Sequence, residues 1–188
     1  MPLGGSAPGP AFGANQDRRG YAEPMASPSV QLHLLRHAHA GDPAKWHGPD
    51  ELRPLSARGR HQAESLGRHL DGLGQHFDLL VSSPLVRARQ TAELVGERLG
   101  LAVVIDDRLG GGLGVAGLEA LLADHGNPAR PILVGHDPDF SELVASLAGA
   151  QEIPMRKGAL ARIDIGRPIQ PGGGVLAFLI PPEVIASH

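Results

Sequence analysis

Arginine and histidine side chains follow several short apolar runs of this sequence, where they could bind and transfer a phosphoryl group. Arg36 and His37 follow one run, Arg87 lies shortly after a second, and His136 follows a third. Guanidinium groups offer paired N–H donors that match phosphate oxygens, so Arg36 and Arg87 are expected to clamp a phosphoryl dianion. A neutral imidazole beside such a clamp is a competent nucleophile toward phosphorus, because one nitrogen can attack while the other is held by a hydrogen bond.

Of the two histidines, His37 is the better candidate for the nucleophile, because it directly follows Arg36 at the mouth of the first apolar run. His136 is expected to donate hydrogen bonds to the equatorial phosphoryl oxygens and to stabilise charge that grows in the transition state. Two arginines and two histidines can carry out this reaction without a metal ion or a cofactor, so we expect the protein to use neither. The residues therefore predict phosphoryl transfer through a histidine.

The apolar runs are expected to be β-strands whose ends position these side chains. Four of them are short and bounded by polar or Gly/Pro-rich segments: Gln31–Leu35, Phe77–Val81, Ala102–Ile105 and Pro131–Val134. Two more strands, 159–165 and 175–180, are joined by a connection too short for a helical crossover, which predicts a C-terminal antiparallel hairpin. Ligands of open α/β sheets bind beyond the carboxyl ends of the strands, so the residues with chemistry are expected at one edge.

Segments with helical periodicity separate these strands. Ser56 is a suitable N-cap for one helix, and Ser83 is expected to cap a second helix with Pro84 in its first position. Further helices are predicted over Leu118–His125 and after Pro138. Strands that alternate with helices predict a single α/β domain, a three-layer α/β/α sandwich with a mostly parallel central sheet.

Composition and charge narrow the class of protein. The chain has 188 residues, 41% of them hydrophobic, no cysteine and a net charge of −3, which suits a globular core and predicts no nucleic-acid partner. Residues 1–30 are rich in Gly and Pro and are expected to be a disordered tail before a domain at 31–188, with Met25 a possible true start. No apolar run is long enough for a secretory signal or a membrane span, so a cytoplasmic protein without membrane contact is expected. The oligomeric state stays open.

Five stretches of the sequence resemble the motifs of one protein family. In order they are LLRHAHAG (34–41), RPLSARGRHQA (53–63), SSPLVRARQTAE (82–93), LVGHDPDFS (133–141) and MRKGAL (155–160). On these motifs the chain resembles the histidine phosphatase superfamily, formerly named for phosphoglycerate mutase, and most closely its small SixA-type branch. A phosphoglycerate mutase itself is disfavoured, because the chain is short and lacks the insertions that hold a second phosphate.

The resemblance implies a role for each matching residue. It makes His37 the phosphorylated nucleophile, Arg36 and Arg87 the phosphate clamp, and His136 the second pocket histidine, with His39 among the substrate-binding residues. It implies a metal-independent hydrolase that acts on a phosphohistidine protein or on a small phosphomonoester. The alternative is a catalytically weak phosphate-binding or regulatory module of the same fold.

The sequence departs from the family pattern at three places. Ala38 stands where the family usually has glycine, which is acceptable if the backbone keeps a negative φ there. Many members place a glutamate general acid in the loop after the third strand, where this chain offers Asp106 and Asp107 as candidates. Asp137 and Asp139 make the turn after the fourth strand more acidic than usual and could leave a carboxylate for proton transfer.

Two competing interpretations concern histidine and serine. His33, His39 and His47 form a loose cluster that could bind a metal, but strand alternation directs His33 away from the loop and no carboxylate recurs at ligand spacing. Ser82 and Ser83 are interpreted as helix-capping residues rather than as nucleophiles.

Overall fold

A single six-stranded sheet forms the centre of the computed structural model, which describes Met1 and residues 29–185. Its strands lie in the order β3-β2-β4-β1-β5-β6. They are β1 (Val30–Arg36), β2 (Leu79–Ser82), β3 (Val103–Ile105), β4 (Pro131–Gly135), β5 (Leu160–Ile165) and β6 (Gly174–Ile180). Strands β1 to β4 are parallel, whereas β5 pairs antiparallel with both β1 and β6. The mostly parallel sheet and the C-terminal hairpin are confirmed.

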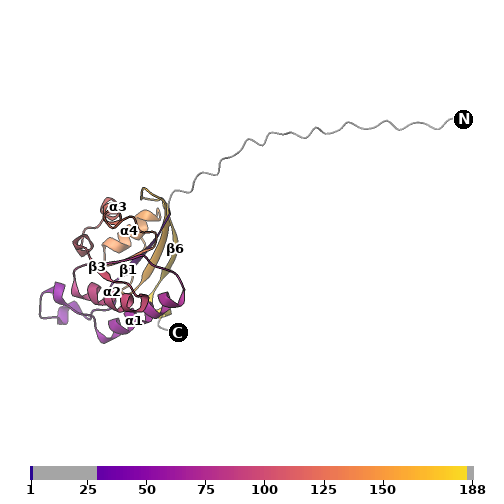
Figure 1. The fold of residues 1–188 in the computed structure, drawn as a ribbon. Helices are drawn as coiled ribbons and strands as arrows, with labels where there is room; N and C mark the ends of the chain where they lie inside the picture. The colour runs from indigo at the N-terminus through magenta and orange to yellow at the C-terminus, as the bar shows by residue number, and fades with distance from the viewer. Residues whose placement is uncertain (2–28, 186–188) are drawn as a thin grey trace.

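Helices lie on both faces of the sheet (Figure 1). The helices are α1 (Ala57–Gly72), α2 (Val86–Leu99), α3 (Val115–Asp124), α4 (Asp139–Leu147) and α5 (Pro182–Ile185), and the 3₁₀ turns are η1 (Pro43–Lys45), η2 (Asp50–Leu52) and η3 (Asp107–Gly110). One face carries α3 and α4, and the other carries α1, α2 and α5. The predicted α/β/α sandwich is therefore confirmed. The predicted tail, including Met25, lies almost wholly outside the described residues.

Two aliphatic cores hold the layers together. On the α3/α4 face, Leu32 and Leu34 of β1 pack in one cluster with Phe140, while Leu35 packs in a second cluster on the α1/α2 face. Alternate residues of β1 therefore serve opposite cores, and the strand is buried along most of its length. The carboxyl end of β1 is held on both faces of the sheet, which fixes the position of the residues that follow it.

Two helices begin at residues other than those predicted. Helix α2 begins at Val86, because Leu85 keeps an extended conformation (ψ 135°) as its N-cap. The expected cap, Ser83, hydrogen-bonds elsewhere. Helix α3 begins at Val115, three residues before the predicted start, although Gly117 is a poor helix former. Burial of Leu118 and its neighbours one turn on favours the longer helix.

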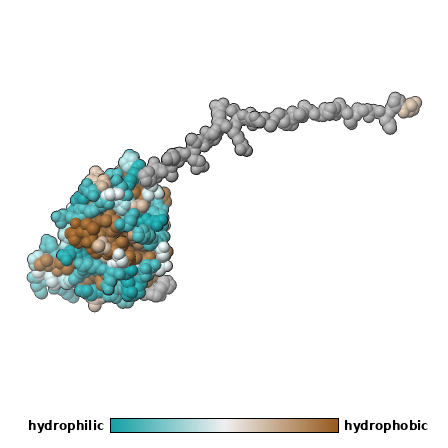
Figure 2. All heavy atoms as spheres, viewed as in Figure 1, coloured by the Kyte–Doolittle hydropathy of each residue, from teal (hydrophilic) through white to brown (hydrophobic). Residues whose placement is uncertain are grey.

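Strand β3 forms an apolar edge of the sheet. Val104 and Ile105 are 37% and 45% exposed, and apolar residues gather over β3 on the face shown in Figure 2. Within the described part of the chain, no helix combines the length and hydropathy needed to cross a membrane.

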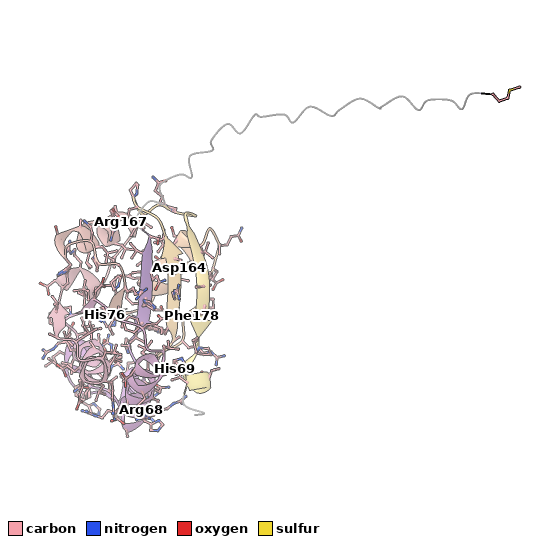
Figure 3. The ribbon with its side chains drawn as sticks, turned by 45° about the vertical axis from the view of Figure 1, so that its right-hand side comes forward. Arg68, His69, His76, Asp164, Arg167 and Phe178 are labelled. Atoms are coloured by element: carbon pink, nitrogen blue, oxygen red, sulfur yellow. The ribbon has the colours of Figure 1, made fainter. Side chains whose placement is uncertain are left out.

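His33 is a core residue of β1 rather than part of a metal site. Its side chain is 1% exposed, and its ring packs edge-on against Phe77 with 5.1 Å between ring centroids. Phe178 of β6 lies on its other side, 6.3 Å away, within the hairpin visible in Figure 3. Burial lowers the pKa of His33 to about 4, against the opposing hydrogen bond with the Pro131 backbone. The ring is therefore neutral in the folded protein at neutral pH.

The depressed pKa of His33 predicts loss of stability in mild acid. His33 takes up a proton near pH 6.5 in the unfolded chain but only near pH 4 in the folded chain. The contribution of neutral His33 to the free energy of unfolding is therefore complete above pH 6.5 and is lost as the pH falls toward 4. A shift of this size corresponds to about 3 kcal/mol. Urea unfolding of His33→Leu between pH 7 and pH 4 should show a shallower decline in unfolding free energy than wild type. Equal declines would contradict this account.

Candidate active site

The carboxyl ends of β1 and β4 bring two histidines together. These strands are parallel neighbours with Arg36 opposite Gly135, so the residues that follow each strand leave the sheet side by side. The backbone N–H of His37 donates to the Gly135 carbonyl at 2.9 Å. The imidazole rings of His37 and His136 lie 5.1 Å apart between centroids. The pairing of two strands thus assembles the pair predicted from the turns.

Two hydrogen bonds fix the protonation of His37. Nδ1 lies 2.8 Å from the Ala38 carbonyl oxygen, which only accepts, so Nδ1 carries the proton. Nε–H of Arg87 points at Nε2 of His37 from 3.3 Å, and a guanidinium only donates. Nε2 therefore presents its lone pair, as an attacking nitrogen must.

Burial keeps both imidazoles neutral. His37 is 4% exposed, and burial lowers its pKa to about 3 against the opposing hydrogen bond with the Ala38 carbonyl, with His136 and two arginines lowering it further. Burial also lowers the pKa of His136 to about 4, reinforced by Arg87. Adding a positive charge to either ring beside two guanidinium groups is unfavourable.

Arg36 and His136 each leave a buried polar atom without a partner. Nε of Arg36 and Nδ1 of His136 have no hydrogen bond among the described residues. The NH1 group of Arg36 is engaged, because it contacts both the Met155 carbonyl and, at 2.6 Å, Oδ2 of Asp137. Buried polar atoms are normally hydrogen-bonded, so the two partnerless nitrogens of Arg36 and His136 indicate a place where an anion could bind.

Arg87 is held by Asp50 from the loop between β1 and α1. Its NH1 donates to the Asp50 carbonyl at 2.7 Å, and its NH2 lies 3.0 Å from Oδ2 of the same residue. The Asp50 carboxylate also accepts from Nε of Arg53 at 2.8 Å, and this bond is the main reason that the pKa of Asp50 is lowered. Asp50 is therefore an internal counterion for two guanidinium groups.

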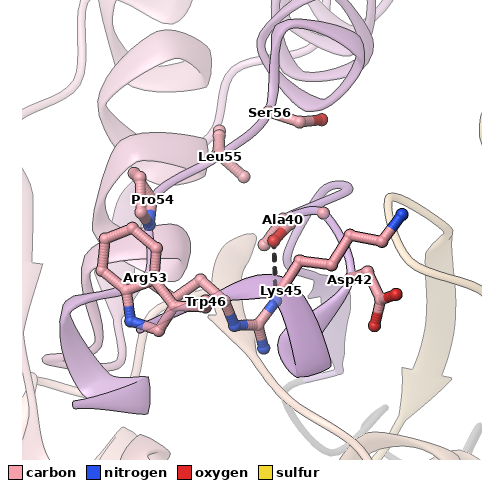
Figure 4. Close-up of a pocket in the computed structure, with 9 residues that line it drawn as sticks. Ala40, Asp42, Lys45, Trp46, Arg53, Pro54, Leu55 and Ser56 are labelled. Carbon is pink, nitrogen blue, oxygen red and sulfur yellow. Dashed lines mark hydrogen bonds between the residues drawn. The ribbon is translucent and has the colours of Figure 1, made fainter. Parts of the chain in front are cut away.

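Arg53 belongs to the site, although the sequence pattern did not predict a role for it. It is only 6% exposed, and its NH1 donates to the Ala40 carbonyl at 2.7 Å (Figure 4). Beside it opens a cavity of about 250 Å³ with Trp46 and Lys45 in its wall. The sequence did contain a signal for Arg53, because this residue begins one of the stretches that resemble the family motifs. Arg53 does not follow a predicted strand, however, so the strand-end rule did not identify it.

Ser82 and Ser83 do not cap α2 as predicted. Ser82 donates from Oγ to the Ser83 carbonyl at 3.0 Å. The Ser83 hydroxyl lies 2.7 Å from Nε2 of His136 and only weakly accepts from the Leu85 N–H at 3.3 Å. Parallel pairing of β2 with β4 places Ser83 beside His136, so the serine orients the imidazole instead of starting the helix.

Helices α1 and α2 support the loop that carries His37. The Ala38 N–H donates to the Thr91 hydroxyl of α2 at 3.1 Å. Among described non-glycine residues only Asn127 has a positive φ, so alanine fits at position 38 without strain. Gly59 of α1 lies so close that a Cβ there would overlap the His39 carbonyl. The loop is therefore packed tightly against both helices.

The His39 side chain contacts Ser56 and Gly41. Its Nδ1 lies 2.8 Å from the Ser56 hydroxyl and accepts weakly from the Gly41 N–H. The Ser56 Oγ also accepts from the Gly59 N–H at 3.1 Å, which bears out the predicted N-cap of α1. No hydrogen bond joins the His39 side chain to Arg36 or Arg87 among the described residues. Its contacts anchor the loop to α1.

The contacts of Asp106 argue against a role in proton donation. Its carboxylate binds Nε and NH2 of Arg108 at 2.9 and 2.7 Å and lies 3.2 Å from Nε2 of His125. The hydrogen bonds from Arg108 hold the pKa of Asp106 far below its usual range, so this carboxylate stays ionised. Asp107 is exposed in the first turn of η3.

Asp137 and Asp139 have partners as well. Asp137 is paired with Arg36 and also accepts from the Ser141 hydroxyl at 2.9 Å. Asp139 accepts from the Leu113 N–H at 2.8 Å. Across the described residues, no group of three or more His, Cys, Asp or Glu side chains is arranged to hold a metal ion.

Comparisons with known proteins agree with this geometry. A family model described as the histidine phosphatase superfamily (branch 1) matches residues 32–111. The chain is 31% identical over 132 residues to phosphohistidine phosphatase SixA of Escherichia coli. The aligned region covers 67% of this chain and 79% of that protein. An uncharacterized protein of Picosynechococcus is 37% identical over 127 residues, 65% of this chain and 75% of its own length. The structure of the protein histidine phosphatase SixA complexed with tungstate superposes with a TM-score of 0.72 at 25% identity, over 83% of this chain and 99% of that one.

The position of Asp50 predicts that it competes with anions for the clamp. Asp50→Asn keeps the shape of the side chain but removes the negative charge beside Arg87 and Arg53, so inorganic phosphate should bind several-fold more tightly, as measured by titration calorimetry. Glu51→Gln removes the same charge one residue away, where no ion pair exists among the described residues, and should change affinity less. Weaker phosphate binding by Asp50→Asn would show that Asp50 aligns Arg87 rather than opposing the anion.

Proposed function

We propose that this chain, which belongs to the SixA-type branch of the histidine phosphatase superfamily, is a phosphatase that works through a phosphohistidine formed on His37. The observation that carries the proposal is the unprotonated Nε2 of His37, buried beside Arg87, with two buried nitrogens that lack partners among the described residues, Nε of Arg36 and Nδ1 of His136, on neighbouring side chains. A nucleophile next to a dianion site is what phosphoryl transfer requires.

In the first step, the phosphoryl group binds between Arg36 and Arg87. Its oxygens accept from the Nε–H of Arg36, which has no partner among the described residues, and from the Nε–H of Arg87, which points at His37 in the free protein. Nε2 of His37 is thereby released to attack phosphorus in line with the leaving group. The Ala38 carbonyl holds the Nδ1 proton and stabilises the positive charge that develops on the ring.

His136 completes the phosphoryl site from the carboxyl end of the neighbouring strand β4. Its orphaned Nδ1 is the atom available to bind an equatorial oxygen, while the Ser83 hydroxyl holds Nε2. In the second step, water attacks the phosphorus and the electron pair of the P–N bond returns to Nε2 of His37. Arg36, Arg87 and His136 neutralise the growing charge in both steps, so the proposed reaction needs no metal ion.

Membership of the SixA-type branch supports the proposed substrate class. The named relative is a phosphohistidine phosphatase, so we propose a phosphohistidine protein or a small phosphomonoester as the substrate. The competing possibility, a phosphate-binding module without turnover, shares the clamp but forms no covalent adduct. The two are separated by trapping the enzyme intermediate.

Brief mixing with an aryl phosphate, followed by an alkaline quench, should add one phosphoryl group to the intact mass of the wild-type chain. His37→Ala should give no adduct, because the attacking nitrogen is gone, whereas His47→Ala changes an exposed loop histidine and should react like wild type. If folded wild-type protein gives neither an adduct nor free phosphate, the chain is a binding module and the proposal is wrong.

The pKa of His37 predicts that phosphorylation tolerates mild acid. The nucleophile must be neutral, and with a pKa of about 3 it stays neutral at pH 5. The rate of adduct formation, corrected for ionisation of the substrate, should change less than about twofold between pH 7 and pH 5. An unperturbed histidine would lose roughly 25-fold over this range. A loss of that size in quenched-flow measurements would mean that the pocket does not depress the pKa of His37.

A further inference from the structure

The segment 155–158 wraps around the residues that precede and include the nucleophile. The Met155 carbonyl accepts from NH1 of Arg36. Three residues later, the Gly158 N–H donates to the carbonyls of both Arg36 and His37, at 3.1 and 3.0 Å. Lys157 lies between these two attachments. Its backbone is therefore fixed beside the site, although no predicted strand end pointed to it.

The ammonium group of Lys157 lies in the field of the phosphate-binding cations and has no partner of its own. The side chain is half-buried and forms no hydrogen bond or ion pair among the described residues. Burial lowers the pKa of Lys157, and repulsion from Arg53, Arg36 and Arg87 lowers it further, while Asp42 opposes the change. An unpaired, partly desolvated cation beside three guanidinium groups is unfavourable until an anion binds.

The carboxylates around the pocket are poorly suited to deliver a proton. Asp50 bridges Arg53 and Arg87, and Asp137 is paired with Arg36. Both carboxylates are therefore occupied by guanidinium groups, which makes them poorly placed to donate a proton to a leaving group. His39 is a weak acid for a different reason, because burial and the nearby Lys157 lower its pKa and keep it neutral. Lys157 has no such ion pair within the described part of the chain, and its lowered pKa makes its proton easier to transfer than that of an ordinary lysine.

We infer that Lys157 is the general acid of this phosphatase, protonating the leaving group as His37 displaces it; the inference rests on the proposed function. The new bond joins Nε2 of His37 to phosphorus, and the bond from phosphorus to the leaving oxygen or nitrogen breaks. The departing atom keeps the electron pair and takes a proton from Nζ of Lys157. In the second step the neutral amine accepts a proton from the attacking water, which restores the ammonium group.

The test compares leaving groups in the Lys157→Met variant. Rates of His37 phosphorylation are measured by rapid quench with para-nitrophenyl phosphate, whose leaving group needs no proton, and with an alkyl phosphate, whose leaving group does. Loss of a general acid should slow the alkyl substrate by about 10²-fold or more and the nitrophenyl substrate by only a few-fold. Lys45→Met, which removes an exposed lysine from the neighbouring cavity, should react like wild type with both substrates.

Lys157→Arg separates proton transfer from charge. A guanidinium keeps the positive charge but does not release its proton, so this variant should reproduce the selective loss with the alkyl substrate. Recovery of the alkyl rate in Lys157→Arg, or equal losses for both substrates in Lys157→Met, would overturn the inference and make Lys157 a phosphate-binding residue. Thermal melting checks folding, and the arginine variant decides alone if the methionine variant unfolds. If wild-type protein forms no phosphohistidine with para-nitrophenyl phosphate, the proposed function itself fails.

Discussion

The two hydrogen bonds on the His37 ring are the constraint on which the rest of the site depends. The Ala38 carbonyl requires a proton on Nδ1, and the Arg87 guanidinium requires a lone pair on Nε2, so only the neutral ring with one tautomer satisfies both. Burial on all sides supports the same state, because a charged imidazole would be poorly solvated beside arginines. The carboxyl end of β1 positions His37, while α2 holds the Ala38 backbone through Thr91 and supplies Arg87, so the neutral state of this ring requires the sheet and the helical layer on one face of it.

The sequence predicted those parts of the structure that depend on local pattern. Apolar runs and helical periodicity gave the sandwich, and the rule that ligands bind at strand ends brought His37 and His136 to one place. Arg53 and Lys157 were missed, because neither follows a strand that runs toward the site and both reach it through long-range packing. Ser83 shows the opposite error. Its local pattern indicates a helix cap, but pairing of β2 with β4 offers its hydroxyl a buried imidazole instead.

Each arginine of the clamp already has a carboxylate partner in the free protein. Arg36 is paired with Asp137 and Arg87 with Asp50. Arg36, Arg53, Arg87 and Lys157 repel one another. The carboxylates of Asp50 and Asp137 reduce that repulsion and hold the guanidinium groups in position. The same pairs weaken the attraction for an incoming anion. A site that must release inorganic phosphate after each cycle gains from such a balance, since a clamp without counterions would hold its product longer.

The order in which the site residues occur along the chain has a consequence for folding. Arg87 is 50 positions from its partner His37, Ser83 is 53 positions from His136, and Arg36 reaches across 119 positions to the Met155 carbonyl. Contacts of such separation form only after long loops have closed, and strand β1 needs the late strands β4 and β5 on either side. His37 is therefore synthesised early, and its surroundings are completed last. During translation, a nascent chain that ends before residue 158 lacks the Gly158 N–H that binds the carbonyls of Arg36 and His37, so the backbone around His37 is fixed only when nearly the whole domain has left the ribosome.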